Sequence, residues 1–147
     1  MFTQIAIGTA TMIATVLLSA LFAYVAVTAL IRCGPWLVRR PHEPKFLAAL
    51  VAVMIWTITA ITLSVWTWAL LFWALGAFDT LEACLYFAFA SFTTLGFGDL
   101  LLPQEFRLLS GLAATNGLLL FGLFTAFLVE IMRRIRTEQL RGKPDRE

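Results

Sequence analysis

Four long stretches without a charged residue constrain this chain more than any other feature of its sequence. They cover residues 1–31, 46–78, 83–98 and 108–129, and all the charged residues lie in the short segments between them and in residues 130–147. A helix needs about 20 apolar residues to cross the hydrocarbon core of a bilayer. The first, second and fourth stretches are long enough, so we expect an all-α membrane protein with three transmembrane helices.

The composition also indicates a chain embedded in lipid. Of its 147 residues, 61% are hydrophobic and 14% are charged, whereas soluble domains carry about 45–50% apolar and about 25% charged residues. This composition disfavours a disordered chain, a disulfide-rich secreted scaffold and a nucleic-acid-binding protein. The first stretch lacks a basic segment before it and is longer than the apolar part of a signal peptide, so we expect a retained helix.

The third apolar stretch is too short to span a membrane. A helix over residues 83–98 would reach about 24 Å, and Gly96 and Gly98 make a continuous helix costly at its end. A short apolar segment between two spanning helices is typical of a re-entrant loop, whose non-helical backbone has to be shielded by protein. Residues 79–82 (Asp-Thr-Leu-Glu) have the form of a capping box, which predicts a short helix over residues 80–92.

The charged residues predict the orientation. The loop at 32–45 has four basic residues and one acid, and residues 130–147 have six basic residues and four acids. Residues 79–107 instead have one base, Arg107, and four acids: Asp79, Glu82, Asp99 and Glu105. Positive loops face the cytoplasm. We therefore expect a multi-pass protein of the cell membrane with its N-terminus outside and its C-terminus in the cytoplasm.

The sequence Thr94-Leu95-Gly96-Phe97-Gly98-Asp99 directly follows the expected short helix. It resembles the selectivity filter of the potassium-channel family, usually Thr-Val-Gly-Tyr-Gly-Asp. In that family, filter carbonyl oxygens replace the hydration shell of the ion, and glycine permits the backbone conformations that this arrangement requires. The resemblance implies a homotetramer, because one strand of carbonyl groups does not surround an ion.

The resemblance covers residues 46–136 and implies a pore domain there. Its parts are an outer helix (46–76), a pore helix (80–92), a filter (94–99) and an inner helix (104–136). An N-terminal transmembrane helix (1–31) and a cytoplasmic basic loop (32–45) precede it, and a cytoplasmic tail (137–147) follows. In the N-terminal helix Thr11, Thr15 and Ser19 are spaced by four residues, a pattern that lets membrane helices approach closely.

The same resemblance implies which residues bind the permeant ions. Potassium would occupy sites formed by the backbone carbonyls of Thr94, Leu95, Gly96 and Phe97, and Gly98 would complete the filter. Asp99 and Glu105 would lie at the outer mouth, where four copies of the acidic segment concentrate cations. Leu95 and Phe97 replace the commoner Val and Tyr, so the filter lacks a phenolic hydroxyl that could brace it from behind.

The expected inner helix contains a cluster of candidate gating residues. Gly117 and Gly122 resemble the glycines at which such helices bend to open the inner mouth, and two glycines so close together indicate a hinge or close packing. Phe121 is expected to line the cavity beside them. Asn116 is the one carboxamide between residues 108 and 129, and it either faces a water-filled cavity or forms an interhelical hydrogen bond.

These patterns predict a passive, potassium-selective channel that assembles with itself in membrane lipid and needs no cofactor besides the permeant potassium ion. The sequence shows no combination of nucleophile and base and no phosphate-binding loop, so we expect no enzymatic activity and no nucleic-acid partner. Two alternatives stay open. One is a poorly selective cation channel, and the other is a non-conducting accessory subunit of a membrane complex.

Overall fold

Residues 2–37 and 42–141 are described by a computed structural model, and they form an all-α structure. The helices of these residues are, in chain order, α1 (Phe2–Leu37), α2 (His42–Ala74), α3 (Leu81–Phe92), the short 3-10 helix η1 (Gln104–Phe106) and α4 (Arg107–Arg141). Three stretches are long and apolar enough to span a membrane: Phe2–Arg32, Leu47–Ala74 and Gln104–Arg134. The expected membrane fold with three long helices and one short helix is confirmed.

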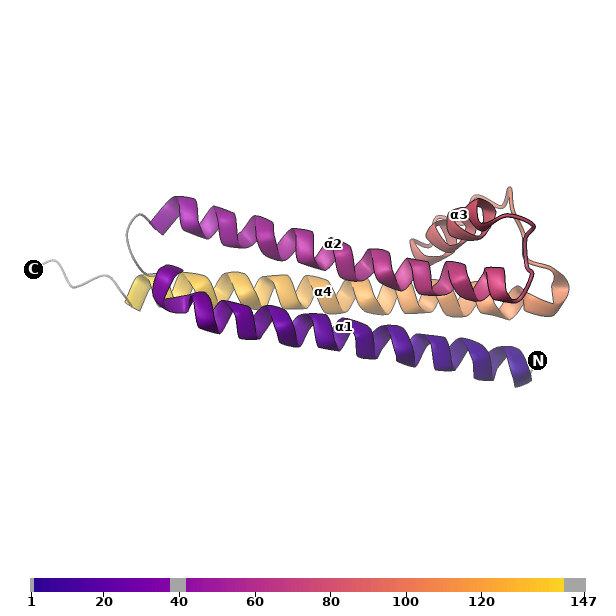
Figure 1. The fold of residues 1–147 in the computed structure, drawn as a ribbon, viewed down its shortest axis with the longest axis horizontal. Coiled ribbons are helices and arrows are strands. Elements are labelled where there is room, and N and C mark those ends of the chain that lie inside the picture. Colours follow the sequence, from indigo (N-terminus) through magenta and orange to yellow (C-terminus); the bar gives the residue numbers. More distant parts are fainter. Residues whose placement is uncertain (1, 38–41, 142–147) are drawn as a thin grey trace, which may run out of the picture.

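The three long helices lie side by side, and α3 packs at one end of them (Figure 1). The N-terminal end of α1, the end of α2 and the start of α4 lie at the same end of the molecule as α3. The last turns of α4 lie at the opposite end. The 12 residues of α3 reach about 18 Å, so α3 is too short to cross a bilayer.

The connection between α1 and α2 is shorter than the sequence predicts. Residues 32–45 are expected to form a loop, but α1 continues to Leu37 and α2 begins at His42. Pro44 is the third residue of α2, where backbone N–H groups have no intrahelical acceptor in any case. Pro35 lies in the last turn of α1, where its missing N–H removes one hydrogen bond to the preceding turn and the helix ends two residues later. The prolines therefore mark the ends of the helices without excluding helix.

At the other end of the chain, α4 is longer than expected. It continues to Arg141, beyond the predicted end at residue 136. The expected tail (137–147) is thus helical in its first part, and residues 142–147 lie outside the described part of the chain.

The end of α2 is fixed by Gly76. This residue has a φ of 64°, and its N–H donates to the Trp73 carbonyl while the N–H of Ala77 donates to the Phe72 carbonyl. These two bonds form a Schellman motif, which needs a left-handed residue that glycine supplies without strain. The chain then turns back toward α3.

The start of α3 differs by one residue from the predicted capping box. Thr80 is the N-cap, and its hydroxyl oxygen accepts a hydrogen bond of 3.2 Å from the N–H of Ala83. Glu82 is therefore the second residue of the helix, one position short of the place that a capping box requires. Its charge still lies in the first turn, where the helix dipole favours it.

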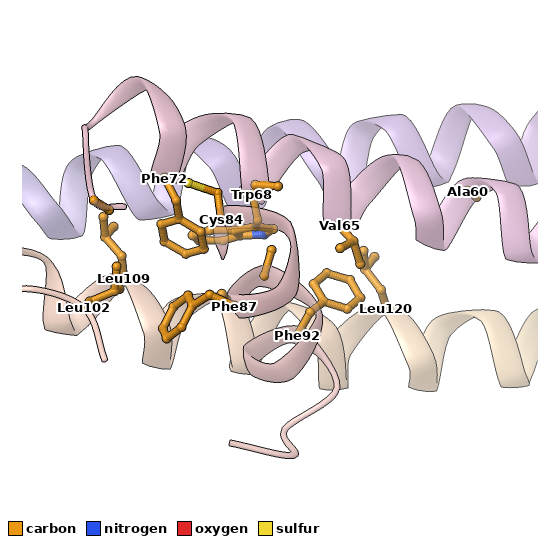
Figure 2. Packing of buried hydrophobic residues seen from close by; sticks show 14 of the residues in the cluster. Ala60, Val65, Trp68, Phe72, Cys84, Phe87, Phe92, Leu102, Leu109 and Leu120 are labelled. Atoms are coloured by element: carbon orange, nitrogen blue, oxygen red, sulfur yellow. The ribbon is translucent and has the colours of Figure 1, made fainter. Parts of the chain in front are cut away.

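Aromatic side chains hold α3 against α2 (Figure 2). Trp68 and Phe72 of α2 are fully buried, and Phe72 meets Phe87 of α3 edge to face, with ring centroids 5.3 Å apart. Cys84 and Ala88 are small and fully buried, so the two helices approach closely. In lipid such packing, rather than transfer from water, stabilises helix association.

Helix α1 is packed against both α2 and α4. A methyl group on Gly8 would overlap the side chain of Leu112 in α4. Farther along α1, the Phe22 carbonyl accepts a hydrogen bond of 2.9 Å from the indole of Trp56 in α2. These contacts make α1 an integral part of the subunit.

Candidate functional site

The loop after α3 has an unusual backbone. The φ angles of Thr94, Gly96 and Gly98 are positive, at 61°, 52° and 79°, whereas those of Leu95 and Phe97 between them are not. Within the described residues, Thr94 is the one residue other than glycine with a positive φ. Such a value costs an L-residue roughly 1–2 kcal/mol. The alternation fits a strand whose carbonyl groups turn to one side.

This loop also caps the end of α3. The N–H groups of Thr93, Thr94 and Gly96 donate to the carbonyls of Phe89, Ser91 and Ala90, at 2.9, 2.9 and 3.1 Å respectively. Thr94 thus occupies the left-handed position after a helix end that is most often glycine. The bonds fix the start of the loop to the last turn of α3, in which Ala90, Ser91 and Phe92 are buried.

The carbonyl oxygens of residues 94–98 have no such partners. Among the hydrogen bonds of the described residues, none ends on one of these five carbonyls. The loop is also exposed, with 62% of Leu95 and 68% of Phe97 accessible on the single chain. A buried or membrane-embedded carbonyl without a partner is costly. The five carbonyls are therefore available to a ligand.

Asp99 is held by a residue that sequence reasoning missed. The hydroxyl of Tyr86 in α3 donates a hydrogen bond of 2.7 Å to Asp99 Oδ2. This bond favours the ionised carboxylate and lowers the pKa of Asp99 below its usual value. The two residues are 13 positions apart, and a periodic pattern does not connect a helix residue with a loop residue at that separation. Tyr86 therefore places a phenolic hydroxyl beside the loop, a group that Phe97 does not have.

The other residue expected at the outer mouth, Glu105, lies between the loop and α4 in the chain. Glu105 is exposed on η1, which leads into α4. A groove of about 580 Å³ separates the loop from the first turns of α4. Its lining includes Thr94, Gly96 and Gly98 on one side and Arg107 and Gly111 on the other.

The two glycines of α4 have different surroundings. A methyl group on Gly117 would overlap the carbonyl oxygen of Phe92, the last residue of α3, and would lie 2.7 Å from its carbonyl carbon. Gly117 therefore provides close packing between α4 and α3. Gly122 is exposed, and a methyl group there would meet no atom within 4 Å. Helix α4 continues through both glycines.

The structure also places the two polar and aromatic candidates of α4. Phe121 is partly exposed and lies edge to face with Phe92, with ring centroids 5.9 Å apart. Asn116 is fully buried, and its Nδ2 donates a hydrogen bond of 2.7 Å to the Thr15 hydroxyl of α1. Of the two roles expected for Asn116, the structure shows the interhelical hydrogen bond.

The described residues form three long apolar helices, a short helix that ends at a buried contact and an exposed loop of unpaired carbonyls. Together these features define a pore-loop membrane protein. The sequence profile of a protein family described as ion channel matches residues 50–134, which is more than half of the chain. The chain therefore belongs to this family of pore-loop cation channels. Ion channels conduct ions and catalyse no reaction, in agreement with the expected absence of enzymatic activity. No curated protein and no solved structure matches the chain.

The matched segment covers most of α2, the whole of α3 and the loop, and α4 as far as Arg134. Helix α1 lies outside it. The part of the chain that the family shares is thus confined to α2–α4 and the loop between α3 and α4.

Proposed function

We propose that the protein is a homotetrameric channel that conducts potassium ions passively through the loop at residues 94–98. The observation that carries this proposal is the row of five unpaired carbonyls on a loop with alternating positive φ. Carbonyl oxygens in this arrangement replace the water around a potassium ion. The ligands would be the carbonyls of Thr94, Leu95, Gly96 and Phe97, with Gly98 completing the strand.

Assembly of four copies would shield the backbone of the loop, which is exposed on a single chain. The loop is non-helical backbone next to membrane-spanning helices, and on one chain its residues are exposed. Such backbone is tolerated at membrane depth only where protein or a water-filled cavity shields it. In a ring of four subunits the neighbouring copy would cover the groove beside the loop, and the carbonyls would face a common axis.

The ligand chemistry favours potassium. No acidic side chain occurs among residues 94–98, so the ion would meet neutral carbonyl dipoles rather than a ring of carboxylates. Helix α3 supports a cation in the same place. Its C-terminal end reaches α4 at Gly117, well inside the span Gln104–Arg134, and the C-terminal end of a helix carries partial negative charge.

The charges favour an orientation with the loop outside the cell. Four acids (Asp79, Glu82, Asp99 and Glu105) belong to the segment that carries the loop, and the basic residues Arg133 and Arg134 lie far along α4 toward the other end. By the positive-inside rule the basic end is cytoplasmic. In a multi-pass protein of the cell membrane, the acids would then surround the outer mouth and attract cations.

Flux from proteoliposomes under separate potassium, rubidium and sodium gradients tests the proposal. We expect potassium and rubidium flux well above sodium flux, together with a tetramer in mild detergent. Equal potassium and sodium flux would replace the proposal with a poorly selective cation channel. A chain that neither conducts nor forms a tetramer would support an accessory membrane subunit instead.

The hydrogen bond between Tyr86 and Asp99 predicts a pH effect. Because Tyr86 lowers the pKa of Asp99, the carboxylate keeps its charge as external pH falls until that lowered pKa is reached. In Tyr86→Phe the pKa rises, so the charge is lost at a higher pH. We expect single-channel conductance at low salt to fall at a higher external pH in Tyr86→Phe than in the wild type.

Asp99→Asn is the control for this pH effect. Without a titrating group at position 99, its conductance at low salt should be below that of the wild type wherever Asp99 is ionised, should equal it once Asp99 is protonated, and should lack this titration. An identical titration midpoint in the wild type and in Tyr86→Phe would show that the hydrogen bond does not control the charge at the mouth.

A further inference from the structure

A buried hydrogen bond joins α1 to α4 in the middle of the membrane-spanning region. Asn116 and Thr15 are both fully buried, and the Asn116 Nδ2 lies 2.7 Å from Thr15 Oγ1. Interhelical hydrogen bonds of this kind stabilise helix association in membranes. Asn116 belongs to the segment that the ion channel family shares, whereas Thr15 belongs to the helix outside that segment.

The surroundings leave Asn116 no second partner. Thr15 Oγ1 directs its own hydrogen toward the carbonyls of Thr11 and Met12, at 3.1 and 2.9 Å, and so accepts from Asn116. Among the described residues, the buried Oδ1 of Asn116 has no hydrogen-bond partner, nor does the buried hydroxyl of Ser19, one turn farther along α1. The attachment of the amide to the subunit therefore depends on Thr15.

Gly117, the next residue of α4, is held in place by α3 rather than by α1. Gly117 lies against the Phe92 carbonyl so closely that a methyl group does not fit. At the level of residues 116 and 117, α4 is thus held by α1 through a hydrogen bond and by the end of α3 through van der Waals contact. Just beyond this level, Gly122 has open space around it, and α4 runs on as one helix (Figure 1).

We infer that α1 is a built-in restraint on gating, which stabilises the unbent form of α4 through the Thr15–Asn116 hydrogen bond. This inference rests on the proposed channel function and on the gating role that the resemblance implies for Gly117 and Gly122, at which bending of the inner helix would open the inner mouth. A bend that begins at Gly117 changes the backbone directly next to Asn116, and the bond to Thr15 holds Asn116 in the position that it has in the unbent helix. Thr15 and Asn116 are positioning residues, because they act on the helix and do not touch the ion.

Single-channel recording of Thr15→Val tests the inference, because valine keeps the shape of threonine and removes the hydroxyl. Loss of one membrane hydrogen bond of this kind changes an equilibrium constant by about threefold. If the four inner helices move together, the factors from the four subunits multiply. We expect the ratio of open to closed time to rise at least about threefold, with unitary conductance and ion selectivity unchanged. Thr15→Ser, which keeps the hydroxyl, should restore the wild-type ratio.

Thr28→Val is the matched control. It makes the same change in the same helix, but among the described residues the Thr28 hydroxyl bonds only to the Tyr24 carbonyl of its own helix. If Thr15→Val and Thr28→Val have the same open-to-closed ratio, or if Thr15→Val lowers it, the inference is wrong while the channel function stands. Wild-type protein that conducts no ions would instead contradict the proposed function.

A second measurement tests the restraint without conduction. Amide hydrogen exchange of α4 residues after Gly117, measured on the intact protein in detergent, should be faster in Thr15→Val than in Thr28→Val. Equal exchange rates in the two variants would show that the hydrogen bond does not restrain α4.

Discussion

We expect Gly96→Ala to reduce potassium flux in proteoliposomes at least about a hundredfold below that of the wild type. The φ of Gly96 is 52°, and a side chain in that region costs roughly 1–2 kcal/mol per residue. In a tetramer each of the four subunits would carry the substitution, so this conformational cost would apply four times. The strand would have to leave its alternating conformation, so its carbonyl groups would no longer form one row. Flux of potassium and rubidium, normalised to the amount of tetramer, measures the effect.

Gly76→Ala is the control, because it introduces similar backbone strain at a glycine outside the row of carbonyl groups. Gly76 has a similar φ of 64° and open space for a methyl group, but it ends α2 and lies outside the loop. We expect this variant to lose some thermal stability and to keep potassium-selective flux. If both variants lost flux equally, the effect of Gly96→Ala would be a general folding defect, and the assignment of the filter would lose its support.

We expect Gly117→Ala to disturb the packing of α4 against α3. The new methyl group would overlap the Phe92 carbonyl, and neither helix backbone can move away without disturbing the aromatic packing around α3. Overpacking usually costs 1–3 kcal/mol, and an overlap with backbone is relieved less easily than one with a flexible side chain. We expect a clear loss of thermal stability and of tetramer yield in detergent.

Gly122→Ala is the comparison for this variant. Its methyl group meets no atom within 4 Å, and alanine favours helix over glycine by about 1 kcal/mol. The subunit should be as stable as the wild type or more so. Equal stability of Gly117→Ala and Gly122→Ala would show that α3 and α4 are less closely packed at Gly117 than the structure indicates.

Much of the fold follows from local properties of the chain. Long charge-free stretches predict the three spanning helices, because in lipid a backbone segment of that length has to satisfy its hydrogen bonds within a helix. The short apolar stretch and the two glycines that end it predict the re-entrant helix and its loop. The boundaries between α1 and α2 were harder to predict, since a proline in the first or last turn of a helix breaks few bonds.

The candidate site likewise has a part that the sequence predicts and a part that it does not. Residues 94–99 are contiguous, so their pattern alone identified the loop as the candidate site. Tyr86 was missed, because its bond to Asp99 depends on how the loop folds back along α3. The expected gating glycines look equivalent in the sequence, yet one meets the end of α3 and the other meets open space.

Hydrophobicity, segment length and the conformational freedom of glycine are local properties, so the three long apolar helices, the short helix between two of them and the glycine-rich loop could all be predicted from the sequence. The bond of Asn116 to Thr15, the packing of Gly117 on Phe92 and the bond of Tyr86 to Asp99 appear only in the folded chain. Each of these contacts joins residues of two different elements. The relative placement of such elements depends on the packing of the whole subunit, which no local pattern records.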